Sequence, residues 1–222
     1  PKNLIIPNKT VDDIFNNYFG TTLNLNELQT RINLIKEWYE DKGYSLARIN
    51  GPERISGDGV VSLNVDEGKV SDIKLRFLGS DGEPIVDGKP KKGKTKDWVI
   101  KRELKTIPGS IFNRKILEAD IKRLYATSLF DDVKVSLGSD KNNPGQVIII
   151  LDLSELRTGS LTGGIGYSNG AGVFAQIGLQ ETNAFGRAWT TGINLNFGEY
   201  ATTYNFSLSD PWIKGDKHKT SF

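Results

Sequence analysis

The sequence contains no cysteine, no methionine and only one histidine, His218. The absence of cysteine excludes disulfides, thiolate zinc sites and cysteine nucleophiles. A single imidazole is too few for most metal-binding or acid–base arrangements, so we expect no enzyme, no metal site and no cofactor. The sequence also lacks any run of about 18 apolar residues, which excludes a transmembrane helix. A membrane role would therefore require β-strands.

An excess of charge of one sign is also missing. The 29 Lys and Arg residues nearly balance the 27 Asp and Glu residues, which leaves a net charge of +2. A nucleic-acid-binding protein concentrates basic residues on one surface, so we expect no nucleic-acid partner. The 222 residues, 37% of them hydrophobic, suffice for two small domains or one larger domain. Because the chain begins at Pro1 and has no methionine, we expect an excised or processed piece.

The chain repeats itself with an offset of 86 positions. The stretches "EWYEDKGYSLARI" and "KRLYATSLFDDVKV" each indicate the end of a helix followed by a short strand. The offset pairs Ile35 with Ile121, Trp38 with Leu124, Tyr39 with Tyr125, Tyr44 with Phe130 and Ile49 with Val135. Large rings at such positions usually fill the space between a helix and a sheet. We therefore expect a core position for Trp38, Tyr39, Tyr44, Tyr125 and Phe130.

In the first copy, apolar residues at spacings of four, three and four form one stripe of a helix that Asn24 would cap. The stripe consists of Leu28, Ile32, Ile35 and Tyr39. Strands are expected at "LII" (4–6), "YSLARI" (44–49) and "VVSLNV" (60–65). With a short helix at "TVDDIF", the order becomes strand, helix, helix, strand, strand.

The second copy has the same order. Strands are expected at "VSDIKLRFL", "FDDVKVSL" and "QVIIILDL", and helices at "DWVIKREL" and "NRKILEADIKRLYAT". A three-stranded sheet covered by two helices is a minimal two-layer α+β domain. We expect one such domain over residues 1–69 and another over 70–156.

The two copies differ most in a long basic loop over residues 79–96, which only the second copy contains. It carries Lys89, Lys91, Lys92, Lys94 and Lys96. A solvated loop is the ordinary interpretation of such a charge run, and contact with an acidic surface or lipid head groups is the alternative.

The composition changes after residue 156. The last 66 residues hold nine charged side chains, against 47 in the preceding 156 residues. Their strands alternate apolar and aromatic residues with Gly, Asn, Gln, Ser and Thr, as in "WTTGINLNF" and "TTYNFSLS". An uncharged polar face opposite an apolar face is typical of a barrel strand between water and lipid, whereas soluble strands usually carry Lys and Glu. Four such strands are expected in residues 157–222, fewer than the roughly eight of the smallest membrane barrel.

Taken together, these residues resemble the BamA-type outer-membrane assembly superfamily. The junctions "GYSLARI" and "LFDDVKV", the stretch "ETNAFGRAWTTGINLNFG" and the strand end "SDPWIKGDK" carry the resemblance. The loop before Asp97 and the amino-acid sequences of both repeats are most similar to cyanobacterial members and chloroplast outer-envelope members. The resemblance implies an α+β fold of tandem POTRA (polypeptide-transport-associated) domains, followed by the first strands of a transmembrane β-barrel.

The resemblance also implies a function without catalytic residues. The domains would bind unfolded outer-membrane proteins or preproteins by β-augmentation and pass them to the barrel. The other implied partners are neighbouring POTRA domains and outer-membrane lipid. The expected location is the outer membrane, with the domains in the periplasm, or in the intermembrane space of a chloroplast. Two-partner secretion, a chloroplast-type import channel and a soluble periplasmic scaffold remain alternatives.

Candidate site residues follow from the same resemblance. The middle strand of each domain in sequence order commonly lies at a sheet edge, and the first barrel strand lies at the barrel seam. The client-binding candidates are Arg48, Ile49, Val133, Lys134 and Val135. The seam or lipid-facing candidates are Gly163, Gly164, Gly166, Trp189, Phe197 and Trp212. The three glycines would either weaken the pairing of the seam strand or make room inside the barrel.

Overall fold

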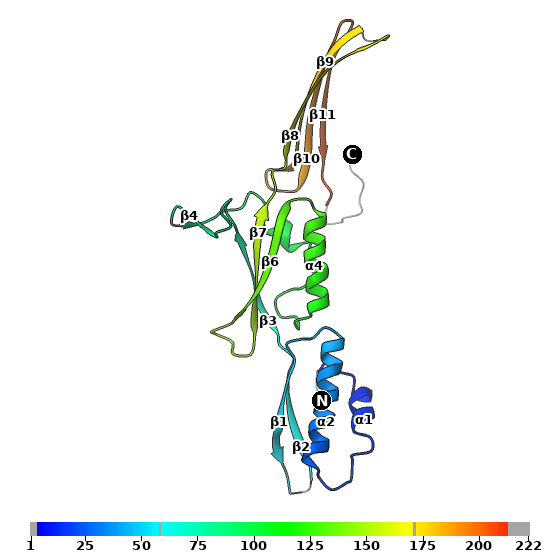
Figure 1. The fold of residues 1–222 in the computed structure, drawn as a ribbon, viewed down its shortest axis with the longest axis vertical. Coiled ribbons are helices and arrows are strands. Elements are labelled where there is room, and N and C mark those ends of the chain that lie inside the picture. The colour runs from blue at the N-terminus through cyan, green and yellow to red at the C-terminus, as the bar shows by residue number, and fades with distance from the viewer. Residues whose placement is uncertain (1–3, 58, 171, 213–222) are drawn as a thin grey trace. The chain divides into compact units, whose positions relative to one another are not determined.

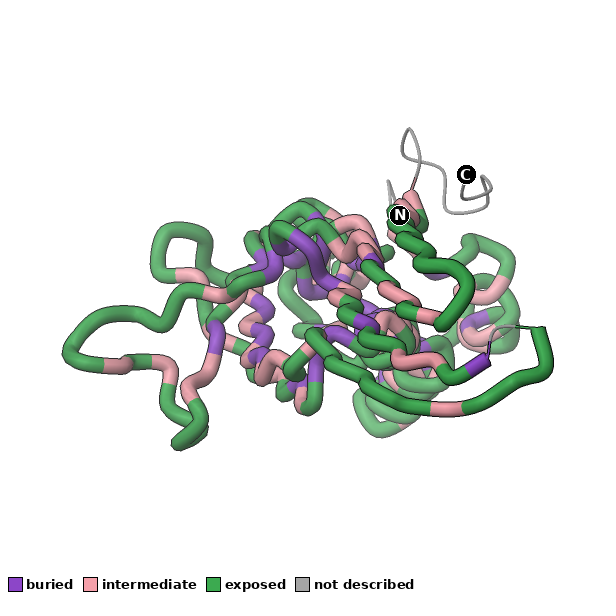
Figure 2. Tube along the Cα trace, turned by 90° about the horizontal axis from the view of Figure 1, so that it is seen from above, coloured by how far each residue is buried: buried purple, intermediate pink, exposed green. Residues whose placement is uncertain are grey.

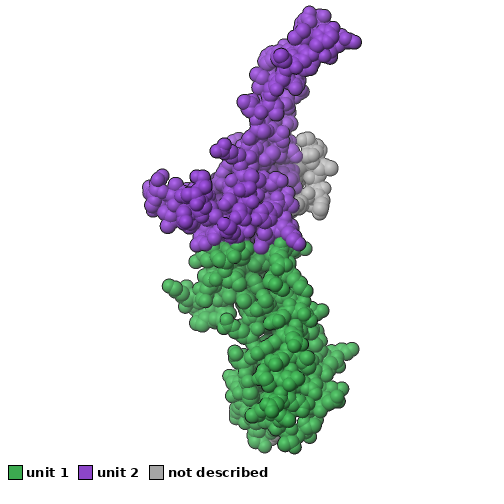
Figure 3. Space-filling model, in the orientation of Figure 1, with its two compact units in different colours: residues 1–74, 105–120, 135–150 green, residues 75–104, 121–134, 151–222 purple. Residues whose placement is uncertain are grey.

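The computed structural model describes residues 4–57, 59–170 and 172–212 (Figure 1). His218 and the end of the expected barrel segment lie outside these residues. The chain divides into two compact units, residues 1–74, 105–120 and 135–150, and residues 75–104, 121–134 and 151–222 (Figure 3). This division runs through the second expected domain. The expected boundaries after residues 69 and 156 therefore stay predictions.

The first repeat contains helices α1 (Asn8–Phe15) and α2 (Leu25–Asp41) and strands β1 (Arg48–Ile55) and β2 (Val61–Asp66). The Asn24 side chain caps α2 by accepting hydrogen bonds from the backbone N–H groups of Asn26 and Glu27, as expected. The apolar stripe of α2 is buried in a cluster with Ile6 and Ile49. Strands β1 and β2 pair antiparallel and form a two-stranded sheet.

The expected first strand at residues 4–6 is wrong. Leu4, Ile5 and Ile6 form no strand, and the N–H of Ile5 donates instead to Glu67 Oε1 at 2.7 Å. The buried Glu67 carboxylate also accepts the hydroxyl of Tyr39 at 2.6 Å. Burial and this hydrogen bond raise the pKa of Tyr39 above its ordinary value. A buried carboxylate needs such donors, and the backbone N–H of Ile5 supplies one of them.

The second repeat comprises β3 (Val70–Phe77), α3 (Asp97–Lys101), α4 (Arg114–Ala126), β6 (Phe130–Ser139) and β7 (Val147–Glu155). Its sheet has the order β3-β7-β6, so the middle strand in sequence, β6, lies at an edge as expected. The long basic loop carries a small hairpin of β4 (Ile85–Val86) and β5 (Lys89–Pro90). Figure 2 shows buried positions in the helix–sheet layers, whereas most of the loop is exposed.

A four-stranded antiparallel sheet follows, with β8 (Gly159–Ser168), β9 (Gly172–Ala184), β10 (Trp189–Gly198) and β11 (Thr202–Ser209). Its order is β11-β10-β9-β8, which leaves β8 and β11 at the two edges. The four strands fall where the alternating pattern predicts them.

The aromatic residues of the repeats differ in burial. Tyr39 and Phe130 are buried, and Trp38 and Tyr44 are half-buried. The expectation of a core position is wrong for Tyr125, which is 41% exposed. Its hydroxyl bonds to groups at the start of β6, which keeps the ring at the surface.

Candidate functional site

The edge strand β6 carries three of the candidate client-binding residues. Val133 turns its side chain into the core, Lys134 is exposed, and Val135 is half-buried. Alternate residues of a strand direct their N–H and C=O groups to the same side, so Val133, Val135 and Leu137 share one edge. Because β6 ends the sheet order, that edge has no strand neighbour in the described part of the chain.

Tyr125 covers the beginning of this edge. The backbone N–H of Val133 donates to the Tyr125 hydroxyl at 3.0 Å, and that hydroxyl donates to Asp132 Oδ1 at 3.1 Å. Lys134 Nζ lies 3.3 Å from Asp132 Oδ2. The Tyr125 hydrogen bond, together with Lys134, holds the pKa of Asp132 below its usual value. Sequence reasoning missed this cap because the repeat offset pairs Tyr125 with Tyr39, and a large ring at that position indicates a core residue.

The candidates of the first repeat lie on β1. Arg48 pairs with Asp66 and Ile49 with Val65 across the two-stranded sheet. Arg48 is exposed, whereas the Ile49 side chain is buried in the domain core. Ile49 can therefore offer a partner only its backbone groups.

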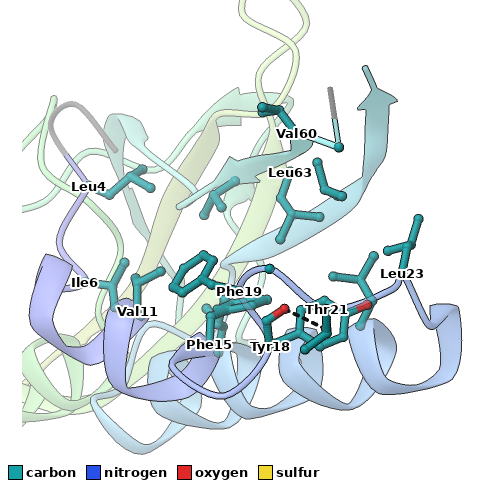
Figure 4. A pocket seen from close by; sticks show the side chains of 16 residues that line it. Leu4, Ile6, Val11, Phe15, Tyr18, Phe19, Thr21, Leu23, Val60 and Leu63 are labelled. Atoms are coloured by element: carbon teal, nitrogen blue, oxygen red, sulfur yellow. Dashed lines mark hydrogen bonds between the residues drawn. The ribbon is translucent and has the colours of Figure 1, made fainter. Parts of the chain in front are cut away.

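An apolar groove of about 530 Å³ lies beside β2 in the same domain (Figure 4). Phe15, Phe19 and Leu63 are among its lining residues, and Phe19 is 67% exposed. The repeat offset of 86 places β2 at the position of β7, which has strand neighbours on both sides. Within the described residues, β2 pairs only with β1.

The four-stranded sheet has two chemically different faces. Leu161, Leu179, Ile193 and Phe206 form one row across all four strands, and each of them is exposed. The adjacent row consists of Thr162, Gly178, Asn194 and Asn205. An exposed apolar row beside an uncharged polar row matches a strand set between lipid and water.

The seam candidates lie on β8. Its pairing with β9 is continuous from Gly159 to Ser168, so Gly163, Gly164 and Gly166 do not interrupt the hydrogen-bonded register. A Cβ atom at Gly166 would lie 2.6 Å from Cζ of Phe174, so this glycine makes room for that ring. The outer edge of β8 has no strand neighbour among the described residues.

The three aromatic candidates have different surroundings. Phe197 is 43% exposed on the apolar face. Trp189 is half-buried and stacks under the guanidinium of Arg187, 4.9 Å from the ring centroid. The structure places Trp212 against α3 rather than on the apolar face, since its Nε1 donates to Glu103 Oε1 at 2.9 Å.

Within residues 4–57, 59–170 and 172–212, no helix is long and apolar enough to cross a membrane. In the same ranges, no three His, Cys, Asp or Glu side chains gather as a metal site would require.

Two family models match the chain. "POTRA domain, ShlB-type" covers residues 2–68, and "Surface antigen variable number repeat", a POTRA model, covers residues 85–155. The N-terminal domain of Omp85 from the cyanobacterium Thermosynechococcus elongatus is 41% identical, with a TM-score of 0.63 over 71% of this chain and 64% of that structure. The chain carries POTRA domains and is homologous to the Omp85 and BamA family.

Two further relatives extend into the four-stranded sheet. Outer envelope protein 80, chloroplastic, of Arabidopsis thaliana is 28% identical over 98% of this chain and 29% of its own length. BamA from Haemophilus ducreyi, in a structure lacking POTRA domains 1–3, is 26% identical with a TM-score of 0.56. That match covers 95% of this chain and 39% of the structure, so the strands after the second POTRA domain are inferred to begin a barrel. The chain spans less than a third of the curated relative from Arabidopsis.

These matches confirm the expected family and fold class, including the similarity to cyanobacterial and chloroplast members. The homologues carry the names of outer-membrane and outer-envelope proteins.

Proposed function

We propose that this chain is the POTRA and early-barrel part of an outer-membrane β-barrel assembly factor, and that its POTRA domains bind unfolded client strands. The observation that carries the proposal is the exposed edge of β6 at the end of the sheet order β3-β7-β6. The names of the homologues support an outer-membrane location, with the POTRA domains in the periplasm or in the intermembrane space of a chloroplast.

The physical basis is backbone hydrogen bonding. An unfolded barrel strand in water has unpaired N–H and C=O groups along both edges and aggregates readily. An edge strand such as β6 satisfies one of these edges by adding the client as a further strand. Because backbone groups make the contacts, many client sequences can bind.

Tyr125 limits where a client strand can pair. It already occupies the N–H of Val133, so the open part of the edge begins at Val135 and continues through Leu137. Of the three candidates on β6, Val135 thus becomes the principal one. Val133 becomes available only when Tyr125 moves away.

The apolar face of β8 to β11 supports the membrane half of the proposal. Leu161, Ile165, Tyr204 and Phe206 are each more than half exposed. Exposed apolar area of this extent is unfavourable in water and favourable against lipid. The open edge of β8 would then offer a template for the client strand at the seam.

Site-specific photo-crosslinking in the full-length parent protein tests client binding. A photoreactive residue at Leu137 on β6 should crosslink to an unfolded outer-membrane β-barrel protein, whereas one at Ile148 on the central strand β7 should not. Val135→Pro should reduce the Leu137 crosslink, because proline removes an edge N–H and is tolerated on an edge strand. Equal crosslinking at Leu137 and Ile148 would contradict the proposal.

A second candidate, which the family resemblance also implies, is a secretion or import channel. Such a channel would prefer a single exported partner or incoming preproteins. Competition among several unrelated unfolded barrel proteins separates the two functions. If each unfolded barrel protein reduces the Leu137 crosslink of the others, the result supports an assembly factor. If one preferred partner keeps its Leu137 crosslink in the presence of the others, the result supports a channel.

A further inference from the structure

The segment before α3 is fastened to the turn between β9 and β10. Thr95 and Asn183 are both buried, at 2% exposure each, and Asn183 Nδ2 donates to Thr95 Oγ1 at 2.8 Å. The N–H of Lys96 donates to the carbonyl of Gly186 at 2.9 Å. A buried side-chain hydrogen bond between residues 88 positions apart is costly to break, because both groups would lose their partner inside the protein.

Charged groups reinforce this contact. Glu155 accepts the backbone N–H groups of Lys94 and Thr95 at 2.8 and 2.6 Å. Lys94 Nζ donates to Glu181 Oε2 at 2.7 Å and to Thr158 Oγ1 at 2.9 Å. The end of the long basic loop is thus bonded both to the end of β7 and to the end of β9.

The turn itself is shaped for the contact. Phe185, Gly186 and Ala188 all have positive φ angles, of 57°, 70° and 57°. Non-glycine residues adopt this region at a cost, so surrounding contacts must hold the turn. Asn183 Oδ1 accepts the N–H of Ala188 at 2.9 Å, and a Cβ atom at Gly186 would collide with the backbone carbonyl of Lys94.

A second contact involves the other end of α3. The guanidinium of Arg102 contacts two indole rings, 5.0 Å from the centroid of Trp98 and 4.9 Å from that of Trp212. Trp212, just after β11, also donates its Nε1 to Glu103 Oε1. Burial lowers the pKa of Arg102, while the carboxylates of Glu103 and Asp210 oppose that shift. Cation–π contacts of a desolvated guanidinium are among the stronger ones.

We propose that residues 94–103 form a two-point clamp that fixes the second POTRA domain to the turn after β9 and to the chain after β11. The covalent connection, residues 156–158, is short but single, and one connection alone permits rotation. Two contacts, one before α3 and one at its other end, prevent this rotation because a helix of five residues separates them by roughly 7 Å. The clamp therefore fixes the direction of the seam strand β8 relative to α3 and to the first residues of β6, 130–134, which lie in the same compact unit. Its role in client transfer rests on the proposed function.

Distance measurements between spin labels test the clamp directly in the full-length protein in lipid. These 222 residues contain no cysteine, so cysteines introduced at Asp131 and Tyr200 label uniquely within them. With the clamp intact, we expect one narrow distance population. Gly186→Ala should abolish that population and give a broad distribution. Gly170→Ala is the matched control, since it lies at the other end of the β8–β9 hairpin and a Cβ atom there meets nothing within 4 Å.

A milder variant keeps the test decisive if Gly186→Ala fails to fold. The double variant Thr95→Val with Trp212→Phe removes one hydrogen bond from each contact. Valine keeps the shape of threonine, and phenylalanine keeps an aromatic ring beside Arg102. The double variant should broaden the distribution, and Thr95→Ser in place of Thr95→Val should restore most of the narrow population. An unchanged narrow population in the double variant would overturn the clamp.

Client assays separate the clamp from the proposed function. Loss of the clamp should slow client insertion while crosslinking at Leu137 persists, since the β6 edge itself is intact. If wild-type protein shows no client crosslink at all, the proposed function fails. The spin-label distances still decide whether the clamp exists.

Discussion

Tyr39 and Tyr125 occupy the same position in the two POTRA repeats, yet their surroundings differ. Tyr39 is 1% exposed and donates its hydroxyl to the buried carboxylate of Glu67. Tyr125 is 41% exposed and places its hydroxyl between Asp132 and the N–H of Val133. One hydroxyl stabilises a core, and the other covers the start of a strand edge.

The difference between the two tyrosines follows from the residue at the position of Glu67 in each repeat. The offset that pairs the two tyrosines pairs Glu67 with Leu153, which is fully buried in β7. The second repeat therefore has no core carboxylate at that position, and a buried tyrosine hydroxyl there would lack its partner. A repeat can keep a ring and still change its role when the residue opposite it changes.

The largest expected effect separates the two tyrosines. Tyr39→Phe should lower the free energy of unfolding of the first domain by about 2 kcal/mol, because the buried Glu67 carboxylate loses a donor. Tyr125→Phe should change the free energy of unfolding of the second domain by less than about 0.5 kcal/mol, as expected for a surface position. Urea unfolding followed by residue-resolved NMR signals, with separate reporters in each domain, measures both free energies. Equal destabilisation by the two variants would refute the comparison.

The ends of the two long helices extend the comparison. After α2, Gly43 has a φ of +93°, and its carbonyl accepts the N–H of Arg114 at 2.8 Å. After α4, Ser128 takes the positive φ, at +56°. A Cβ atom at Gly43 would lie 2.7 Å from Oδ1 of Asn113, whose Nδ2 donates to the carbonyl of Lys42. The first repeat thus ends its helix in a contact with the loop before α4.

We expect Gly43→Ala to cost about 1 kcal/mol because of the left-handed backbone, less than Tyr39→Phe. The additional loss of the Asn113 contact should appear as faster amide exchange at Arg114. Gly20→Ala is the matched control, because Gly20 also has a positive φ of +76° but a Cβ atom there meets nothing within 4 Å. If both variants accelerate exchange at Arg114 equally, the helix-end contact contributes nothing. The effect should be smaller than that of Gly186→Ala, since a side chain can shift where a backbone carbonyl cannot.

The sequence was sufficient for features that depend on local periodicity. The α2 stripe, the Asn24 cap and the alternation of β8 to β11 each lie within a few residues of chain, where spacing determines which side chains share a face. The edge position of β6 was accessible through the family resemblance.

Features set by distant partners could not be predicted. The strand expected at residues 4–6 is replaced by a bond from Ile5 to Glu67, 62 positions away. The bond between Thr95 and Asn183 spans 88 positions, and no local pattern marks either residue. The different role of Tyr125 could in principle have been predicted. The offset pairs Glu67 with Leu153, so Tyr125 cannot donate to a core carboxylate at that position as Tyr39 does.

The smallest expected effect concerns pH at the edge of β6. The pKa of Asp132 is lowered in the folded protein, so its interaction is fully present above the unfolded value of about 3.9 and is lost as pH falls through the folded pKa. Protonation removes the charged acceptor of the Tyr125 hydroxyl, which loosens the bond from the Val133 N–H. Amide exchange at Val133, corrected for the intrinsic rate, should therefore rise slightly as pH falls from 5 to 3.

Asp132→Asn provides the control for this change. The amide oxygen of asparagine still accepts the Tyr125 hydroxyl but does not titrate in this range, so corrected exchange at Val133 should be independent of pH. Tyr125→Phe should show fast exchange at every pH, because the cap is absent. If wild type and Asp132→Asn have the same pH profile, Asp132 does not hold Tyr125 over the edge. The packing of the Tyr125 ring would then be enough to keep its hydroxyl on the N–H of Val133, and client pairing at Val133 would be insensitive to acid.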